Sequence, residues 1–281
     1  MASVLEFPPF EIPVAWYPAA GARAVIVLVP AMGTPASYYR PFAELCASRT
    51  LSVLLAELPG SGASRPRPSR RVDYGYRDLV SGYLPALVEQ ARGHCGNKPL
   101  ILLGHSLGGH VGALATLQGE VVVDALVTLA AGNIHYRNWV NKGAGKVRFF
   151  AWLVTVLSHL FGQVPGQYLG LGSPQPRTLM REWAGIISSG SFSHIADALP
   201  AAPPMPALAI GFEGDFMAPS KSVASLAHTL RGDMEWLPVT WPGNAHASWA
   251  RHPELALSVI EKWLAVRGVL SLAGGAPREI D

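Results

Sequence analysis

Short, uninterrupted hydrophobic runs recur along the chain. Residues 24–29 read Ala-Val-Ile-Val-Leu-Val with no polar position among them. Such runs are typical of strands that are buried on both faces of a parallel sheet. The same pattern recurs at residues 51–55, 100–103, 125–129 and 207–210. The sequence therefore predicts that these five segments are strands of one sheet.

Helical patterns lie between these runs. They cover residues 39–49 and 76–92, a segment that opens just after Ser106, and residues 254–267, where Pro253 stands near the helix start. Strands that alternate with helices form βαβ units with right-handed crossovers. The sequence thus predicts an α/β fold with an open, doubly wound, mostly parallel sheet. Residues 271–277 are predicted to be a loose tail.

The interval 133–204 breaks this alternation. It holds an apolar, aromatic run at residues 147–161 and a second helical pattern at 178–187. We therefore expect residues 1–132 and 205–281 to form the core and 133–204 a helical cap. A helical insertion here would lie over the ends of the strands, where open α/β sheets bind ligands.

The first cap run, at about 15 residues, is shorter than the roughly 20 residues that span a bilayer. A buried or cap helix is the favoured interpretation. Peripheral membrane contact is the minority alternative, supported by Lys142, Lys146 and Arg148 near the start of the run.

Composition narrows the class of protein. With 49% hydrophobic and 15% charged residues, the 281-residue chain can bury a large core. Its net charge is +3, and its basic cluster at residues 65–71 is expected to be a solvated loop and not a nucleic-acid site. Cys46 and Cys95 lack metal-type spacing, and the first residues show no secretory signal, so a cytoplasmic location is expected. The oligomeric state stays open.

The stretch Gly104-His-Ser-Leu-Gly108 places one serine on a strand-to-helix turn. Glycines allow the sharp turn that lifts a serine hydroxyl clear of a sheet, and the following helix contributes free N–H groups at its start. Ser106 is therefore the candidate nucleophile. An ordinary glycine-rich turn is the less favoured reading.

A serine hydroxyl is a weak nucleophile and needs a histidine base and an acid that orients it. Asp215 lies on a turn after a predicted strand, and His246 precedes the final helix. Glu213 and His252 are the nearby alternatives. Four other candidates are set aside as packing, rim, pre-strand or insertion residues: His105, His110, Asp124 and Asp197.

These motifs, taken in order, resemble the α/β-hydrolase superfamily. Gly104-His-Ser-Leu-Gly-Gly109 is similar to its nucleophile elbow and Pro242-Gly-Asn-Ala-His246 to its histidine segment. Gly211-Phe-Glu-Gly-Asp-Phe-Met-Ala-Pro219 resembles its acid turn with one extra residue. The resemblance covers roughly residues 24–132 and 205–267, and it implies Ser106, Asp215 and His246 as the catalytic triad.

Two segments depart from the family pattern. Pro30-Ala-Met-Gly33 stands where the family usually has His-Gly, and the alignment implies that the backbone N–H groups of Met32 and Leu107 form the oxyanion hole. Glu57 stands where the family has an aspartate, and no chemistry is assigned to it. A weaker similarity, to predicted bacterial hydrolases, rests on Ser37-Tyr-Tyr-Arg-Pro-Phe42 and Arg181-Glu-Trp183.

The resemblance implies a serine hydrolase that cleaves a small-molecule ester or thioester through an acyl-Ser106 intermediate. An apolar, aromatic cap predicts a lipophilic or aromatic acyl group, and the candidate pocket residues are Trp139, Phe149, Trp152 and Trp183. An acyltransferase with the same acyl-serine chemistry and a non-catalytic ligand-binding protein are the alternatives. No cofactor, metal or nucleic acid is expected.

Overall fold

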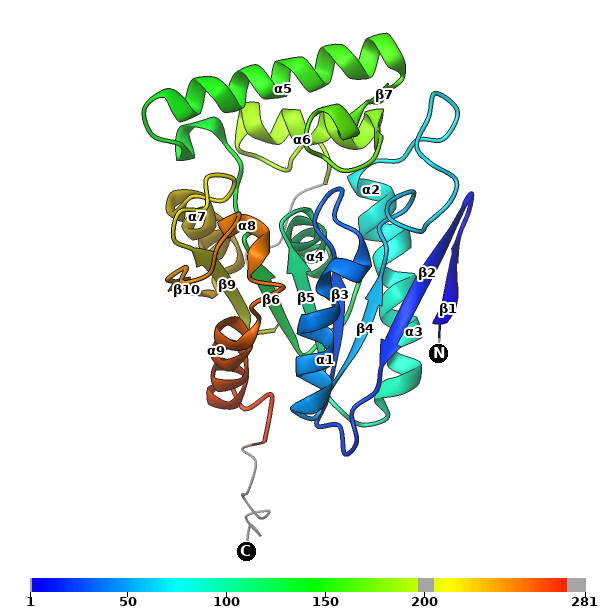
Figure 1. Cartoon of the computed structure of the whole chain (residues 1–281), viewed down its shortest axis with the longest axis vertical. Coiled ribbons are helices and arrows are strands. Elements are labelled where there is room, and N and C mark those ends of the chain that lie inside the picture. Colours follow the sequence, from blue (N-terminus) through cyan, green and yellow to red (C-terminus); the bar gives the residue numbers. More distant parts are fainter. Residues whose placement is uncertain (1, 197–204, 272–281) are drawn as a thin grey trace, which may run out of the picture.

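A computed structural model describes residues 2–196 and 205–271 of the chain. Asp197 and the predicted tail from residue 272 onward lie outside these ranges. Figure 1 shows a large sheet flanked by helices, with two further helices lying across one end of it.

The main sheet has eight strands in the order β1-β2-β4-β3-β5-β6-β9-β10. The pairs β1–β2 and β2–β4 are antiparallel, and the other pairs are parallel. All five predicted strands are present, so the predicted sheet is confirmed. The strands are β1 (Ala2–Phe7), β2 (Phe10–Tyr17), β3 (Ala24–Val29), β4 (Leu51–Ala56), β5 (Leu100–His105), β6 (Ala125–Leu129), β9 (Ala207–Phe212) and β10 (Asp233–Leu237).

The predicted helices are also present, with end points shifted by a few residues. The π-helical segment Leu79–Tyr83 joins α2 to α3, and short 3₁₀ turns occupy Ala36–Tyr39, Tyr136–Asn138 and Gly166–Tyr168. The α-helices are α1 (Arg40–Ser48), α2 (Tyr76–Asp78), α3 (Leu84–Cys95), α4 (Leu107–Leu117), α5 (Lys142–Phe161), α6 (Arg177–Ser189), α7 (Ser220–Leu230), α8 (Ala245–Ser248) and α9 (Glu254–Val266).

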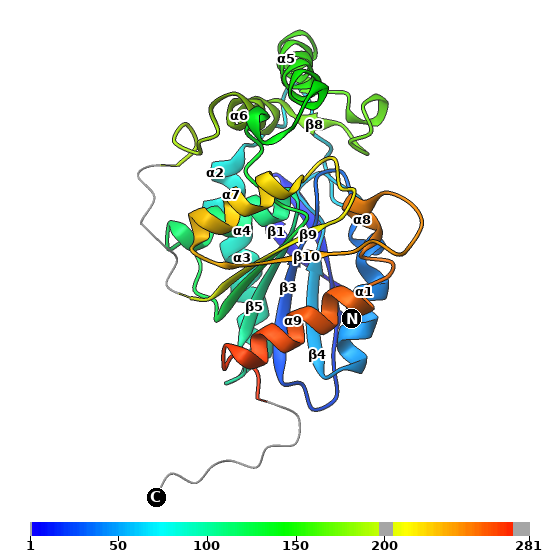
Figure 2. The same ribbon diagram turned by 90° about the vertical axis from the view of Figure 1, so that its left-hand side faces the viewer.

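Helices cover both faces of the sheet, and this explains its continuous hydrophobic strands. On β3, Val25, Val27 and Val29 belong to the core beneath α3 and α4. The alternate residues Ile26 and Leu28 belong to the core beneath α1 and α9. Figure 2 shows these two helical layers on opposite sides of the sheet. Because successive side chains on a strand point to opposite faces, both sets must be apolar.

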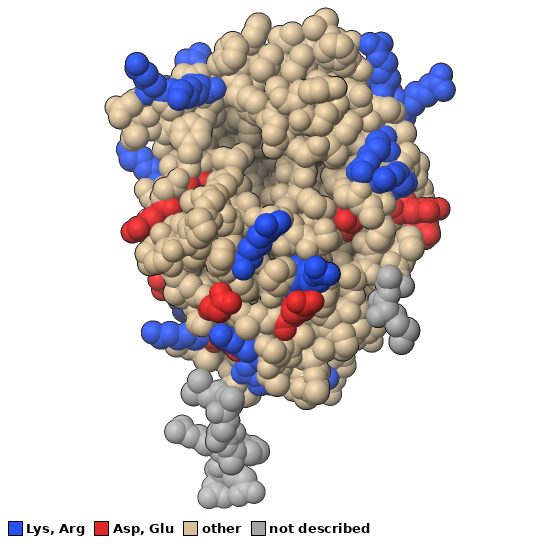
Figure 3. Space-filling view, viewed as in Figure 1, with Lys and Arg blue, Asp and Glu red and all other residues tan. Residues whose placement is uncertain are grey.

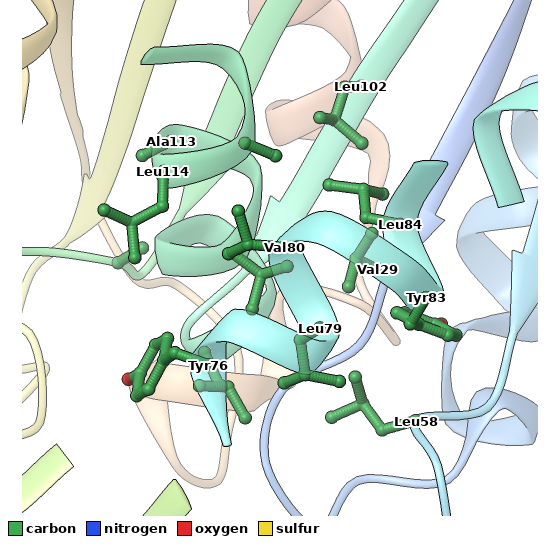
Figure 4. Close-up of a cluster of buried hydrophobic side chains, with 14 of the residues drawn as sticks. Val29, Leu58, Tyr76, Leu79, Val80, Tyr83, Leu84, Leu102, Ala113 and Leu114 are labelled. Carbon is green, nitrogen blue, oxygen red and sulfur yellow. The ribbon is translucent and has the colours of Figure 1, made fainter. Parts of the chain in front are cut away.

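The segment from α2 into α3 closes one of these cores. Tyr76, Leu79 and Tyr83 are fully buried, and Figure 4 shows them in one cluster with Leu102 of β5 and Leu114 of α4. The hydroxyl of Tyr83 donates to the carbonyl of Glu57 at 3.0 Å. Aromatic packing and this hydrogen bond therefore hold the segment in place below the cap.

The cap consists of α5, α6 and the two-stranded sheet of β7 (Gln163–Val164) and β8 (Gln175–Pro176). Both predicted cap helices are present, and α5 begins five residues before the apolar run. Figure 1 shows α6 between α5 and the core, so α5 is the outermost layer. Arg177 Nε and the Thr178 hydroxyl, at the start of α6, donate to Asp73 at 2.9 and 2.6 Å.

Candidate active site

Ser106 lies at a strained turn between β5 and α4. Its φ is +52° and its ψ is −113°, a conformation that residues with a side chain rarely adopt. A Cβ at Gly108 would lie 2.2 Å from the carbonyl oxygen of Val29, so only glycine fits there. Every residue of α4 is buried, which locks the turn in place. The strain at Ser106 is therefore built into the packing around it.

Asp215 and His246 lie together, although 31 positions separate them in the sequence. Asp215 Oδ2 accepts from His246 Nδ1 at 2.9 Å. Asp215 Oδ1 accepts from the backbone N–H groups of Met217 and Ala218 at 2.8 and 3.1 Å. Because Nδ1–H is committed to the carboxylate, the second ring nitrogen of His246 is left as a base.

The alternative acid and base lie elsewhere. Glu213 is exposed, whereas the side chain of Asp215 has no exposed area. His252 stacks on the ring of Trp241 with the centroids 5.9 Å apart. The structure thus brings Ser106 and His246 to one cavity, with Asp215 behind the histidine. In the described part of the chain, Ser106 Oγ has no hydrogen-bond partner.

The backbone around Ser106 presents two amides to the same cavity. Met32 and Leu107 both line it, as the sequence alignment implies. Within residues 2–196 and 205–271, neither of their N–H groups donates to a protein acceptor. Leu107 is also the first residue of α4, so its amide lies at the positive end of the helix dipole. Two free donors beside a serine suit a negatively charged oxygen.

A buried chain of hydrogen bonds connects the loop of Met32 to His246. The N–H of Ala31 donates to the Tyr39 hydroxyl at 2.8 Å, and that hydroxyl donates to His105 Nδ1 at 2.7 Å. His105 Nε2 then donates to the carbonyl oxygen of His246 at 2.8 Å. Burial lowers the pKa of His105 well below its usual range, so the ring stays neutral and can accept and donate at once.

Sequence reasoning set His105 aside as a packing or rim residue and gave Tyr39 no role. Full burial of His105 agrees with a packing residue, but the hydrogen bonds at both of its nitrogens were not foreseen. Two signals were present in the sequence. His105 directly precedes the nucleophile, and Tyr39 lies in the segment that resembles predicted bacterial hydrolases.

Two further buried polar groups support the site. Glu57 accepts from the N–H groups of Ala36 and Ala63 at 2.8 and 3.1 Å, so it ties two loops together, and burial raises its pKa. His110 donates from Nε2 to the carbonyl of Gly132 at 2.7 Å and pairs through Nδ1 with the Tyr76 hydroxyl at 3.1 Å. Burial lowers the pKa of His110 to about 4.

Two adjoining chambers lie between the cap and the core. The chamber at Ser106 measures about 150 Å³ and is partly polar. The second measures about 260 Å³ and is almost entirely apolar. Figure 3 shows the surface hollowed between the cap and the body of the molecule. Ile134, Trp183 and Met217 line both chambers, so the second continues the first beneath the cap.

Two of the four predicted pocket residues line the apolar chamber. They are Trp139 and Trp183. The other two, Phe149 and Trp152, lie on the outer face of α5 with 60% and 58% of their area exposed, so their prediction as pocket residues was wrong. Phe150 faces the chamber instead. Neighbouring residues of a helix point about 100° apart, so a shift of one position changes the face.

No group of three His, Cys, Asp or Glu side chains that could hold a metal ion occurs in residues 2–196 and 205–271.

Comparisons with known proteins agree with this architecture. The chain superimposes on a soluble variant of monoglyceride lipase from Saccharomyces cerevisiae with a TM-score of 0.73, 13% identity and 96% coverage of each chain. A thermophilic esterase from Thermogutta terrifontis gives 0.61, 16% identity and coverage of 96% of this chain and 100% of that one. Est1E from Butyrivibrio proteoclasticus, in a structure with ferulic acid bound, gives 0.66, 14% identity and coverage of 95% and 99%.

At these identities the structural likeness concerns the fold. A comparison with curated proteins finds no sequence match. The sequence model of the Alpha/beta hydrolase family matches residues 26–258, which extend from β3 into α9. The chain therefore belongs to the alpha/beta hydrolase family.

Proposed function

We propose that this protein hydrolyses carboxylic esters or thioesters of a lipophilic or aromatic acyl group through an acyl-Ser106 intermediate. The observation that carries the proposal is the position of Ser106 at a strained turn, in one cavity with a histidine whose Nδ1–H is held by Asp215. The structural likeness to lipases and esterases, at low sequence identity, adds only that the fold accommodates such chemistry.

The first half of the reaction forms the acyl-enzyme. His246 Nε2 takes the proton of Ser106 as Oγ attacks the substrate carbonyl carbon. The carbonyl oxygen becomes negatively charged and accepts from the N–H groups of Met32 and Leu107. His246 then gives its proton to the leaving alcohol or thiol, and the bond to the leaving group breaks.

The second half releases the acid. His246 removes a proton from a water molecule, whose oxygen attacks the acyl carbon. The tetrahedral intermediate collapses, Ser106 Oγ leaves and takes the proton back from His246. Asp215 accepts from Nδ1–H and stabilises the imidazolium in both halves.

The apolar chamber supports the choice of acyl group. Its wall is formed by Trp139, Val147, Phe150, Trp183 and Ile187, and it continues from the chamber at Ser106. Each buried methylene of a substrate contributes about 0.8 kcal/mol. We therefore expect kcat/KM to rise by at least about tenfold from acetyl to octanoyl esters. Equal rates on both esters would contradict the assignment of this chamber to the acyl group.

The test of the nucleophile is covalent labelling with a fluorophosphonate, read by intact mass. Wild type is expected to gain one adduct, which Ser106→Ala abolishes. Ser258→Ala, at an exposed serine on α9, is the matched control and should label like wild type. No adduct on wild type would overturn the proposal and favour the non-catalytic ligand-binding alternative.

Product analysis separates hydrolysis from acyl transfer. The purified enzyme is given octanoyl thioester in water and in the presence of an alcohol such as glycerol. Free octanoate as the main product supports the hydrolase. An ester of the alcohol as the main product would favour an acyltransferase that uses the same acyl-serine.

A further inference from the structure

The outer face of α5 exposes large apolar side chains. Phe149, Trp152 and Leu160 are 60%, 58% and 61% exposed. They lie three and eight positions apart in succession, which places them along one side of the helix. The rings of Phe149 and Trp152 contact each other with centroids 5.6 Å apart. A helix on the surface of a soluble domain ordinarily turns polar side chains to water, so this face requires an explanation.

The opposite side of α5 is packed against the rest of the cap. Ala151, Val154 and Ser158 are buried there. By length and composition α5 is the one helix in residues 2–196 and 205–271 that could cross a membrane. Because its inner side is held by the cap, the helix is placed to lie along a surface and not to span it.

The segment that carries this face has side-chain charge of one sign. Residues 125–181 contain no Asp or Glu, and their cationic residues are Arg137, Lys142, Lys146, Arg148, Arg181 and Arg177, of which Arg177 is paired with Asp73. Three of these stand in the first turns of α5. In Figure 3 basic side chains lie on both sides of the cap, whereas the acidic side chains of this view lie lower on the molecule, among further basic ones. An excess of positive charge beside an apolar face is complementary to anionic lipid headgroups over acyl chains.

The C-terminal end of α5 is tied to the core by a further cation. Arg70 donates from Nη2 and Nε to the carbonyl oxygens of Leu160 and Phe161, at 2.7 and 3.1 Å. The loop of residues 65–71, expected from sequence to be merely solvated, thus holds the exposed helix in position.

We propose that the outer face of α5 docks on an anionic phospholipid surface. Phe149, Trp152 and Leu160 enter the boundary between headgroups and acyl chains, while Lys142 and Arg148 lie against the phosphates. The inner side of the same helix supplies Val147 and Phe150 to the apolar chamber. Docking therefore brings that chamber close to lipid, whether or not the protein acts on lipid esters.

Sedimentation with sucrose-loaded vesicles tests the proposal directly, because binding needs no catalytic activity. The purified protein is mixed with vesicles of phosphatidylcholine alone or with about one third phosphatidylserine. We expect at least about tenfold stronger partitioning onto the anionic vesicles at low salt, with a decline as salt is raised. Equal and negligible sedimentation with both kinds of vesicle would overturn the proposal.

Matched variants then locate the contact. Phe149→Ser/Trp152→Ser is expected to lower vesicle partitioning at least about tenfold, and Lys142→Gln/Arg148→Gln by about fivefold per charge at low salt. Val266→Ser, on α9 at the far end of the molecule, removes an apolar residue that is 76% exposed and should change nothing. Equal loss in the Val266 variant, or none in the α5 variants, would contradict the assignment.

Gel filtration decides between lipid and a second copy of the chain. If wild type is a dimer that Phe149→Ser/Trp152→Ser makes monomeric, and neither binds vesicles, the face is a protein interface and the proposal is wrong. The salt and lipid dependence of wild type tests the proposal even if that double variant does not fold.

Discussion

The floor and the roof of the cavity are built in different ways. The floor consists of the strained turn at Ser106 and the buried hydrogen bonds beneath it, which join Ala31, Tyr39, His105 and His246. The roof is an apolar wall of cap side chains, of which Trp139 and Trp183 are examples. In the proposed function, the floor carries out the chemistry and the roof selects the acyl group. The two should therefore respond differently to substitution.

The largest effect is expected at the floor, on the rate. Ser106→Ala should lower kcat by about 10⁴-fold or more, and Asp215→Asn by a comparable factor because the imidazole loses its orienting carboxylate. Steady-state kinetics on an octanoyl ester measures both. Glu213→Gln, two residues away and exposed, is the control and should retain full activity. Loss of activity in Glu213→Gln with retention in Asp215→Asn would reverse the assignment of the acid.

The next effect is on folding. Gly108→Ala would place a Cβ 2.2 Å from the carbonyl oxygen of Val29, so the unfolding free energy should fall by about 4 kcal/mol or the protein should not fold. Gly145→Ala, at a helical glycine of the roof with no heavy atom within 4 Å of the added Cβ, should be neutral or stabilise by up to about 1 kcal/mol. Denaturant unfolding of both variants makes the comparison. Equal stability would show that the elbow is not packed as described.

A smaller effect is expected from the hydrogen-bond chain beneath the site. Tyr39→Phe leaves the N–H of Ala31 and Nδ1 of His105 unpaired in a buried place, at a cost of about 1–3 kcal/mol in stability. If these hydrogen bonds position His246, kcat should fall about tenfold while KM changes little. Tyr38→Phe is the control, since Arg251 covers its ring at 4.6 Å and no described bond involves its hydroxyl. A change in stability alone would make Tyr39 merely structural.

The roof should alter specificity and not the chemical step. Phe150→Ala enlarges the apolar chamber and is expected to shift the preferred acyl length, with about tenfold changes in kcat/KM between octanoyl and longer esters. Phe149→Ala, one residue away on the outer face, should leave the kinetics on soluble esters unchanged. The same shift in both variants would mean that the faces of α5 are assigned wrongly.

The last effect is a pH dependence of stability. The pKa of His110 is about 4 in the folded chain and near 6.5 when unfolded, so below pH 6.5 the unfolded state binds more protons. Its contribution, at most about 3 kcal/mol, is complete above pH 6.5 and is lost as pH falls toward 4. His105 adds a loss of the same sign. His110→Gln should flatten the stability curve in that window, and an unchanged slope would contradict the neutral, buried state of His110.

The sequence predicted the floor better than the roof, for a physical reason. The strand, the sharp turn and the start of the helix are adjacent in the sequence, so residues 100–109 alone predict the nucleophile elbow. The central strands were equally predictable, because a strand that is buried on both faces requires a continuous apolar run. Strands β1, β2 and β10, and helix α7, were not predicted. Charged positions such as Glu11 in β2 and Glu235 in β10 interrupt the apolar pattern of these strands.

The cap was predicted as helices but not in its orientation. Because α5 is apolar on nearly every side, its sequence pattern does not predict which face is buried. The inward position of Phe150 and the outward position of Phe149 were therefore not predictable. Long-range polar contacts were equally invisible. The link between His105 and Tyr39 joins residues 66 positions apart, and no local pattern reports such a pairing.

The most direct test of the central claim is to trap the acyl-enzyme. The protein is mixed with an octanoyl p-nitrophenyl ester, quenched in acid during turnover, and analysed by intact mass and peptide mapping. We predict one octanoyl group on the peptide that contains Ser106, and none in Ser106→Ala. Turnover without an acyl-enzyme in wild type, together with full activity of Ser106→Ala, would contradict it.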